Sequence, residues 1–472
     1  MKMQPLMPAS DRLVLIFSLV FLLCCSPWRL VAAKKRIEYL PGFDGPLPFA
    51  LETGYLEVDE EKGVELFYYF VESENNPGED PLMLWLAGGP GCSGLIGLVF
   101  EIGPLSIDLQ GYRDGIPSLL YRPNSLTQTS SVIFVDSPVG TGFSYSRTLE
   151  GLKSETNDTE TVHRLQKFLY TWLQEHPKFK SNPLFIGGDS YGGKITPVLT
   201  LEIANAKELY GAPFNLKGYL AGNPVTDSHF DFDYMIPFVH GMALISDELY
   251  ESTKKSCSGK YAHPSNVNCA KHLDAVNEVI KDINQFNILE PLCDINSLRP
   301  DDIRIRKYAK ESYEEVRFSN SGLPLECRES GYLLAKLWAN NDIVREALGV
   351  RKEIDAEWNR CTNLPNYIKN IHSSVPYHLH VTEKGYPALI YSGDHDKNIP
   401  YLSTQAWIRS FNFSIRDDWR PWYAGGQVAG FTRRYSNNLT FATVKGAGHA
   451  APEYKLKECR AMIGRWLAGA PL

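Results

Sequence analysis

The chain has 472 residues and a formal net charge of −7, with a pI near 5.9. Because one hydrophobic core rarely grows beyond about 250–300 residues, this length predicts either a single large domain with an elaborate insertion or two domains. Lysines and arginines form no run outside the N-terminus. The acidic balance therefore argues against a nucleic acid or an anionic membrane surface as a partner.

The N-terminus has the pattern of a secretory signal. Basic residues precede the apolar run 13–25, and Val31-Ala32-Ala33 offers the small side chains of a cleavage site. A membrane anchor is the alternative, but a bilayer span takes about 20 apolar residues, and Pro27 interrupts this run. We therefore expect residues 1–33 to be a signal peptide. The mature protein is expected in the vacuole or outside the cell, free of the membrane.

Cysteines and sequons agree with this route. Beyond the signal there are seven cysteines, which in an oxidising compartment predict three bridges and one free thiol. The free thiol is expected at Cys459, because Leu456, Cys459 and Ile463 share one apolar face at helical spacing. The pairing of the others does not follow from the pattern. N-x-S/T triplets predict glycosylation at Asn157, Asn412 and Asn438.

The first part of the chain alternates strands with helices. Apolar alternation and short buried runs predict a hairpin over 52–71, then strands over 82–86, 131–135, 183–186 and 216–221, with a helix over 159–176. Strands resume over 387–391 and 439–444, before a last helix over 454–467. This alternation predicts an α/β fold with a mostly parallel sheet that helices cover on both faces.

Between about residues 229 and 386 the pattern changes to helices, cysteines and charged loops. We interpret this stretch as a helical insertion over the sheet edge, which divides the core into residues 34–228 and 387–472. Within it, residues 294–326 are dense in charge and weak in apolar periodicity, which is typical of an exposed loop. A sharper hypothesis is that they form a linker excised after folding, which leaves two chains joined by a disulfide.

The stretch Gly188-Asp189-Ser190-Tyr191-Gly192 fits the G-x-S-x-G nucleophile elbow. It follows a predicted strand and precedes a predicted helix, and its glycines allow the sharp turn that exposes the serine hydroxyl. Because a chain with 37 glycines also forms such turns for structural reasons, the motif alone does not establish a catalytic serine. Whether Ser190 is catalytic depends on finding a base and a carboxylate elsewhere in the chain.

Candidate partners follow two later strands. A serine nucleophile needs a base to accept its proton and a carboxylate to orient that base. Asp394 follows the strand predicted over 387–391, and His449 follows the strand over 439–444. The chain order Ser190, Asp394, His449 is that of the hydrolase version of this fold. The backbone N–H groups of Tyr191 and of the Gly88-Gly89 loop would then form the oxyanion hole.

With these residues in place, the chain resembles the serine carboxypeptidase family of the α/β-hydrolases. The matching stretches are 85–93, 100–104, 138–146, 187–193, 391–394 and 446–449. The resemblance implies an α/β-hydrolase fold with a helical cap, a triad of Ser190, Asp394 and His449, and oxyanion donors at Gly89 and Tyr191. It also implies the disulfides Cys92–Cys361, Cys257–Cys269 and Cys293–Cys327, which leave Cys459 unpaired.

Two departures from the family pattern concern the substrate. Its peptidases carry Gly-Glu-Ser-Tyr-Ala-Gly at the elbow and Asn-Gly-Gly-Pro-Gly at the oxyanion loop, and that Glu and Asn help bind the terminal carboxylate of a peptide. Here these positions are Asp189 and Ala87. A hydrogen bond to a charged group is typically worth about 1.5–3 kcal/mol, so we expect carboxylate binding to be weakened by a factor of roughly 10 to 100. With them, Gly88 and Glu101 are expected to line the substrate site.

Gly-Asp-Ser-Tyr at the elbow resembles the plant acyltransferase branch of the family, and so do 240–246 and 417–422. One departure is Ala450, where that branch usually has Thr. The resemblance implies transfer of an acyl group from a 1-O-β-glucose ester to an acceptor hydroxyl or amine through a serine acyl-enzyme. Its partners would be small-molecule donors and acceptors, and the protein would be a monomer or a homodimer. The alternative activity is a serine carboxypeptidase.

Three other classes fit less well. Residues 89–94 formally match the dinucleotide motif G-x-G-x-x-G, but the oxyanion loop explains the same residues. There is no H-E-x-x-H motif, and we interpret His378 and His380 as an exposed pair in a strand, so no metal or other cofactor is expected. A catalytically inactive binding protein is the remaining alternative, which labelling of Ser190 by a fluorophosphonate would distinguish.

Overall fold

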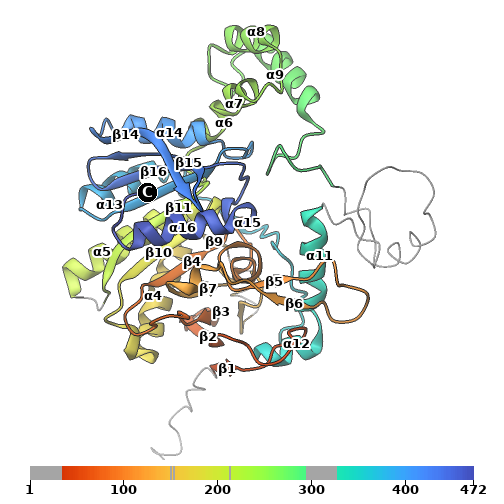
Figure 1. Ribbon diagram of the computed structural model, residues 1–472, viewed down its shortest axis with the longest axis vertical. Coiled ribbons are helices and arrows are strands. Elements are labelled where there is room, and N and C mark those ends of the chain that lie inside the picture. Colours follow the sequence, from red (N-terminus) through yellow and green to blue (C-terminus); the bar gives the residue numbers. More distant parts are fainter. Residues whose placement is uncertain (1–33, 149–150, 152–154, 212–213, 294–326) are drawn as a thin grey trace, which may run out of the picture. The chain divides into compact units, whose positions relative to one another are not determined.

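The computed structural model describes residues 34–148, 151, 155–211, 214–293 and 327–472 (Figure 1). The predicted signal peptide, residues 1–33, and the charged segment 294–326 lie outside the described residues.

A mixed sheet of twelve strands forms the centre of the core. Its strands in chain order are β1 (Lys35–Ile37), β2 (Leu51–Asp59), β3 (Val64–Val71), β4 (Leu82–Leu86), β7 (Ser131–Val135), β8 (Tyr145–Ser146), β10 (Leu184–Asp189), β11 (Leu216–Gly222), β13 (Ala388–Gly393), β14 (Ile415–Ala424), β15 (Gln427–Tyr435) and β16 (Leu439–Val444). The spatial order is β1-β2-β3-β7-β4-β10-β11-β13-β16-β15-β14, and β8 pairs with β3. Two small pairs lie apart, β5 (Leu105–Ile107) with β6 (Leu119–Tyr121), and β9 (Thr156–Asn157) with β12 (Tyr367–Ile368).

The six central strands, from β7 to β16, are parallel, and antiparallel strands flank them on both sides. Every residue of β4, β7, β13 and β16 is buried, which explains the short apolar runs in the sequence. The predicted parallel sheet is therefore confirmed. In such a sheet the carboxyl ends of the strands meet at one edge, where ligands usually bind.

Helices pack on the core sheet (Figure 1). The main ones are α4 (Asp158–Glu175), α5 (Ser190–Tyr210), α14 (Tyr401–Ser410) and α16 (Leu456–Leu467), and shorter turns are α2 (Gly94–Ile96), the π-helical turn η1 (Gly97–Glu101), η2 (Leu126–Gln128), η3 (Pro177–Phe179) and α15 (Ala451–Tyr454). The helix predicted over 159–176 is confirmed as α4. It begins where the side chain of Asn157 accepts a hydrogen bond from the N–H of Glu160.

The stretch 229–386 has two structural parts. Its first helices are α6 (Ser228–Asp233), α7 (Met235–Gly241), α8 (Asp247–Cys257) and α9 (Val267–Ile280), which we call the cap. The cap has a small apolar core of its own and contacts α14 through α6 and α7 (Figure 1). The later helices α11 (Arg328–Ala339), α12 (Asp342–Leu348) and α13 (Val375–Glu383) instead contact β5, β1 and α5. They therefore belong with the core.

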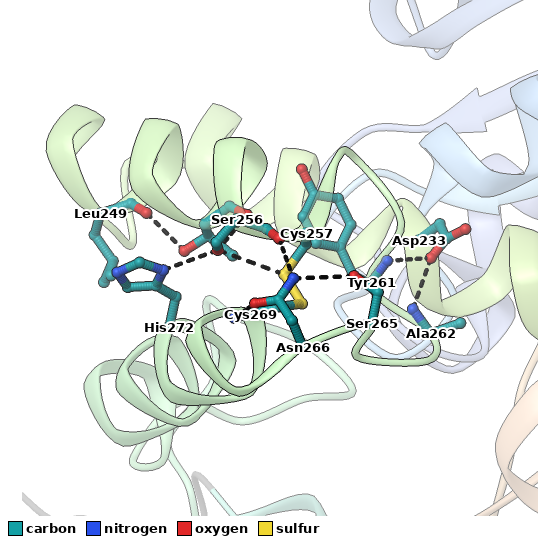
Figure 2. Close-up of a disulfide and its surroundings, with 11 residues drawn as sticks. Asp233, Leu249, Ser256, Cys257, Tyr261, Ala262, Ser265, Asn266, Cys269 and His272 are labelled. Carbon is teal, nitrogen blue, oxygen red and sulfur yellow. Dashed lines mark hydrogen bonds between the residues drawn. A yellow bond between two sulfur atoms is a disulfide. The ribbon is translucent and has the colours of Figure 1, made fainter.

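A disulfide and a capping residue hold the two long helices of the cap together (Figure 2). Cys257 at the end of α8 is bridged to Cys269 in the first turn of α9. Asn266 caps α9 by accepting from the N–H of Cys269 at 2.9 Å, and its amide donates to the carbonyl of Ser256 at 2.8 Å. Asp233 accepts from the backbone N–H of Tyr261 at 2.5 Å, which fixes the loop between the helices.

All three expected disulfides are present, Cys92–Cys361, Cys257–Cys269 and Cys293–Cys327, and Cys459 is free and buried in α16. The strand expected around His378 and His380 is wrong, because these residues lie in helix α13. Pro376 in its first turn is a start signal that the alternation of histidines concealed. His378 is fully buried, with Nδ1 2.7 Å from the hydroxyl of Tyr219, and burial lowers its pKa to about 3.

Candidate active site

Ser190 lies at the turn between β10 and α5. Its φ of +52° is in the left-handed region, which a non-glycine residue adopts only when its surroundings enforce it. Glycines make room for the turn: a Cβ on Gly192 would lie 2.2 Å from the carbonyl oxygen of Leu86, and one on Gly188 would lie 2.7 Å from the same atom. The structure therefore places Ser190 at the elbow that the sequence predicted.

The glycine loop after β4 packs directly on this serine. A Cβ on Gly88 would lie 2.9 Å from Oγ of Ser190 and 3.3 Å from the backbone nitrogen of Tyr191, so only glycine allows this approach. The loop is held from the other side, where Cys92 is bridged to Cys361 and the N–H of Ser93 donates to the carbonyl of Arg360 at 2.9 Å. The disulfide thus anchors the loop that faces the nucleophile.

Asp136 supports the same loop, and sequence reasoning missed it. It is fully buried, and it accepts from the hydroxyl of Ser93 at 2.6 Å and from the N–H groups of Gly94 and Phe143, each at 2.8 Å. Burial raises its pKa to about 6 despite these donors. The only signal in the sequence was its place directly after a buried strand.

His449 has a carboxylate partner, but it is Asp396 and not Asp394. Nδ1 of His449 lies 2.7 Å from Oδ2 of Asp396, which is fully buried. Asp394 is partly exposed and pairs instead with Nδ1 of His395 at 2.5 Å, while it also accepts from the N–H of Gly446 at 2.7 Å. The assignment of Asp394 as the triad acid is therefore wrong.

The reason lies in the turn that follows β13. The strand continues to Gly393, so Asp394 is the first residue of the turn. The N–H of Asp396 donates back to the carbonyl of Gly393, and this turn places the side chain of Asp396 in the interior. There Oδ1 of Asp396 accepts from the N–H groups of Asn398 at 2.7 Å and Ile399 at 3.1 Å. These donors hold the carboxylate in one orientation, with Oδ2 toward His449.

Asn223, a further residue that the sequence did not reveal, connects the acid to the nucleophile. Its amide donates to Oδ2 of Asp396 at 2.7 Å, and its carbonyl oxygen accepts from the N–H of Gly393 at 3.3 Å. Two residues on, the N–H of Val225 donates to the carbonyl of Ser190 at 2.9 Å. Asn223 has a φ of +40° directly after β11, and Gly222-Asn223-Pro224 at a strand end was the available signal.

Four neighbouring strands thus bring these residues to one edge of the sheet. β10, β11, β13 and β16 are adjacent and parallel, and their carboxyl ends lead to Ser190, Asn223, Asp396 and His449 in that order. This is the edge at which ligands bind in open α/β sheets.

A segment that leaves the cap, residues 285–288, lies against both loops of the acid–base pair, and we call it the clasp. The carbonyl of Phe286 accepts from the N–H of His449 at 2.7 Å, and the carbonyl of Gln285 accepts from the N–H of Lys397 at 3.1 Å. A Cβ on Gly448 would lie 2.2 Å from the carbonyl oxygen of Phe286. The clasp therefore fixes the backbone of the loop that carries His449.

A buried carboxyl pair, Glu101 and Asp189, lies beside the elbow. Asp189 ends β10, and Glu101 accepts a hydrogen bond from the indole N–H of Trp85 at 2.6 Å. Burial, and after it the negative charge of Glu453, raises the pKa of Glu101 to about 7. Burial and the charge of Glu101 raise the pKa of Asp189 well above its usual range, and the two carboxyls are hydrogen-bonded. At neutral pH the pair therefore holds a proton.

Glu453 extends this cluster. Its carboxylate accepts from the hydroxyl of Tyr332 at 2.5 Å and lies 3.7 Å from the guanidinium of Arg360, which in turn covers the face of the Tyr332 ring. Glu453 is paired with Arg360, and its negative charge still raises the pKa of Glu101.

A second serine–histidine contact, in the cap, differs from a nucleophile–base pair. The hydroxyl of Ser256 lies 2.8 Å from Nδ1 of His272 (Figure 2). The same hydroxyl donates to the carbonyl of Thr253 at 3.1 Å, so it accepts from the imidazole and is not deprotonated by it. This contact joins α8 to α9.

Neither a cluster of metal-ligating side chains nor a helix suited to a membrane is found in the described residues. In that part of the chain, no three or more His, Cys, Asp or Glu side chains are grouped so as to hold a metal ion. Among the helices described, none combines the length and apolar character needed to cross a membrane.

Comparisons with known proteins agree with this geometry. Residues 41–469 match the family model of serine carboxypeptidases. The chain is 48% identical over 463 residues to serine carboxypeptidase-like 2 of Arabidopsis thaliana, covering 98% of this chain and 97% of that protein. Serine carboxypeptidase-like 19 of the same plant is 46% identical over 451 residues, with 94% and 96% covered.

Among solved structures, the Kex1 prohormone-processing carboxypeptidase of Saccharomyces cerevisiae superposes with a TM-score of 0.70 at 20% identity, over 92% of this chain and 95% of that one. At this identity the likeness shows the shared fold. The chain therefore belongs to the serine carboxypeptidase family, and it is a serine hydrolase with the α/β-hydrolase fold.

Proposed function

We propose that this protein transfers an acyl group from a 1-O-β-glucose ester to the hydroxyl or amine of a small-molecule acceptor, through an acyl-enzyme on Ser190. The observation that carries the proposal is the carboxyl pair of Glu101 and Asp189 beside Ala87. A carboxypeptidase must bind the terminal carboxylate of its substrate at this place.

Above the pKa of about 7 for Glu101, the pair and Ala87 together disfavour a carboxylate. Ala87 has no side-chain donor, and the pair then carries one negative charge, because Glu101 is ionised while Asp189 keeps its proton. Two like charges a few ångströms apart repel strongly in a buried site, where the effective dielectric constant is low. A sugar avoids this cost, because hydroxyl groups donate hydrogen bonds to carboxylates without carrying charge. The neutral, polyhydroxylated glucose ester is therefore the substrate that fits this site.

The first half of the reaction forms the acyl-enzyme. Asp396 holds Nδ1–H of His449, so that Nε2 accepts the hydroxyl proton of Ser190 as Oγ attacks the acyl carbonyl. The N–H groups of Gly89 and Tyr191 stabilise the oxyanion. The acyl C–O bond to glucose then breaks, and His449 returns its proton to the departing glucose oxygen.

The second half repeats this chemistry with the acceptor. His449 deprotonates the acceptor hydroxyl or amine, which attacks the ester on Ser190 and carries the acyl group away, while the proton returns to Ser190. Transfer outruns hydrolysis when the acceptor is bound close to the ester and water is excluded. The chemistry needs no metal or other cofactor.

One observation favours carboxypeptidase activity as a second candidate. At a pH below the pKa of about 7 for Glu101, the protonated pair has an O–H to donate, and a terminal carboxylate accepts such a bond. Peptidase activity would then be confined to acid pH and would fall as the pair loses its proton.

A single assay separates the two candidates. Mature protein is supplied with an acyl-glucose, with and without an acceptor, beside a blocked dipeptide at about pH 5 and pH 7.5. We expect acyl transfer that depends on the acceptor and little release of the C-terminal amino acid. Release of that amino acid without any transfer would reverse the assignment, and Ser190→Ala retaining full transfer would rule out the acyl-enzyme.

A matched pair of variants sharpens the assay. The double variant Ala87→Asn with Asp189→Glu restores the residues that peptidases of the family carry at both positions. We expect it to raise dipeptide cleavage by roughly 10-fold or more, the value of one recovered hydrogen bond to a charged group. Unchanged cleavage would show that these two positions do not set the choice of substrate.

The expected setting of the protein follows from its covalent chemistry. Disulfides are stable in the secretory pathway, and the three bridges agree with that route. We infer a final location in the vacuole or outside the cell. Asn412 and Asn438 are exposed and fit glycan acceptors, while Asn157 is half-buried. We expect a monomer or a homodimer, which light scattering on the secreted protein would measure.

A further inference from the structure

A buried carboxylate, Asp158, connects to the residue that follows the nucleophile. Its Oδ1 accepts from the hydroxyl of Tyr191 at 2.7 Å and from that of Tyr367 at 2.8 Å. Its Oδ2 accepts from the backbone N–H of Ile371 at 2.8 Å. Asp158 is fully buried, so water competes for none of these bonds. Three separate segments of the chain therefore meet at one carboxylate.

The surroundings keep both tyrosine hydroxyls protonated. Asp158 is the first residue of the 18-residue helix α4, so its side chain lies at the end of the helix where backbone N–H groups are free. Burial, and then the charge of Asp158, raises the pKa of the Tyr191 hydroxyl above its usual range. The same two causes raise the pKa of Tyr367. Both tyrosines therefore retain the protons that they donate.

Tyr191 is the point at which this network reaches the reaction. It directly follows Ser190, and its backbone N–H is the proposed oxyanion donor. A small cavity is lined by Tyr191 and Tyr367 together with Ala87 and Gly88 of the loop after β4. The Tyr191 ring lies edge-on to that of Tyr367, with centroids 6.5 Å apart.

The Tyr191 ring is packed in the main apolar core, and its hydroxyl is held by Asp158. The ammonium groups of Lys194 and Lys369 lie 5.7 Å and 5.4 Å from its ring centroid, which are weak, non-directional attractions. The hydrogen bond to a buried carboxylate is directional and short. It is therefore the contact that fixes the orientation of the ring within its apolar packing.

We infer that Asp158 is a positioning residue for the reaction: by anchoring Tyr191 against Tyr367 and Ile371, it fixes the strained turn that carries Ser190 and its oxyanion donor. This role is independent of the acyl group and the acceptor. It goes beyond the proposed function, and it holds equally for a transferase and for a peptidase.

The test measures the nucleophile alone. Wild-type protein and Asp158→Asn are titrated with a fluorophosphonate, and the maximal rate of Ser190 phosphonylation is separated from the apparent affinity of the probe. Because a misplacement of about 1 Å can cost about 100-fold in rate, we expect the maximal rate to fall by 10- to 100-fold with the affinity unchanged. Failure of acyl transfer would not affect this readout, so the two proposals fail independently.

Glu65→Gln is the matched control. Glu65 is a buried carboxyl on β3 that accepts from the guanidinium of Arg351 at 2.6 Å, and the strands β7 and β4 separate β3 from the elbow strand β10. Its variant should label at the wild-type rate. If labelling by Asp158→Asn and by Glu65→Gln falls only in proportion to the folded protein that each variant loses, Asp158 is merely structural and the inference is overturned.

A second variant keeps the test decisive if Asp158→Asn does not fold. Tyr191→Phe removes the same hydrogen bond from the other side and keeps the ring. We expect its maximal rate to fall at least 5-fold, and the double variant to fall no further than Asp158→Asn alone, since both remove one interaction. A Tyr191→Phe protein that labels at the wild-type rate would refute the proposed positioning role.

Discussion

Nδ1 of His449 lies 2.7 Å from Oδ2 of Asp396, although Asp394, two residues earlier, is closer to the end of the strand. The two aspartates have opposite surroundings. Asp396 is fully buried and accepts backbone and amide donors, whereas Asp394 is partly exposed and faces His395. A base needs a fixed, dehydrated carboxylate, and only Asp396 provides one.

This contrast predicts the effect of two parallel substitutions. Asp396→Asn should lower the rate of Ser190 acylation by about 10³- to 10⁴-fold, because an amide presents the wrong tautomer of the imidazole to the serine. Asp394→Asn should lower the same rate by less than about 10-fold, since it loses only the partly exposed pairing with His395. Burst kinetics with an activated ester measure both. Equal losses in the two variants would place the catalytic carboxylate elsewhere.

The close contact between the clasp and Gly448 predicts the effect of adding a side chain there. Gly448→Ala would place a Cβ 2.2 Å from the carbonyl oxygen of Phe286, so the clasp must move away from His449. We expect a loss of at least 10-fold in the turnover rate with a smaller change in KM. Gly464→Ala on α16 is the control, because its Cβ would make only an ordinary van der Waals contact, 3.9 Å from Oγ1 of Thr129. It should keep full activity and gain about 0.5–1 kcal/mol.

The carboxyl pair links stability to pH. The pKa of Glu101 rises from 4.5 to about 7 in the folded state. A carboxyl with a raised pKa contributes stability that is complete below its unfolded pKa of 4.5 and is lost as the pH rises through about 7. The difference of about 2.5 pKa units corresponds to about 3 kcal/mol.

We therefore expect the Tm of the wild type to fall as the pH rises from about 5 to 8. Glu101→Gln keeps an acceptor for the indole of Trp85 but cannot titrate, so its Tm should fall less over the same range. Calorimetry on both proteins checks this. The variant also removes the Glu101 charge that raises the pKa of Asp189, so both carboxyls then contribute less to the pH dependence. Parallel curves would show that the carboxyl pair is not its source.

Removing either of two disulfides should lower stability, but only one removal should also slow the labelling of Ser190. Cys92–Cys361 closes a loop of 269 residues and anchors the oxyanion loop, whereas Cys257–Cys269 closes 12 residues inside the cap. By loop entropy, removing them costs about 5–6 and about 3 kcal/mol respectively. We expect the paired alanine variant of the first also to slow Ser190 labelling, and that of the second to leave labelling within about 2-fold. Slower labelling in the cap variant alone would contradict this.

The sequence predicted the central strands, the hairpin β2–β3 and helix α4, because each has a clear period and a defined end. It did not predict the long hairpin of β14 and β15, because β14 is mostly exposed and rich in charge and β15 mixes buried and exposed residues without a clear alternation. Such strands lack the apolar alternation on which prediction depends. Their pairing with β16 is a tertiary effect.

The candidate site was predicted in outline and missed in detail. Ser190 and His449 follow strands directly, so their motifs located them. Choosing Asp396 over Asp394 required knowing which side of a turn is buried, and that depends on the packing of a distant segment. Asn223 and Asp158 belong to no motif, and they were identified only by the hydrogen bonds they make to the elbow and to the acid.

The clasp, residues 285–288, precedes His449 by about 160 positions in the chain and nonetheless supplies the carbonyl that holds its backbone. The cap can therefore be exchanged only if the clasp keeps its contact with His449. Any graft from a relative, made to change the substrate, would have to deliver a carbonyl oxygen at the same point in space. A chimera whose junction lies between α9 and the clasp keeps residues 285–288 and should keep His449 in position. A chimera whose junction lies after residue 288 replaces the clasp with the cap and should lose this contact and the activity that depends on His449.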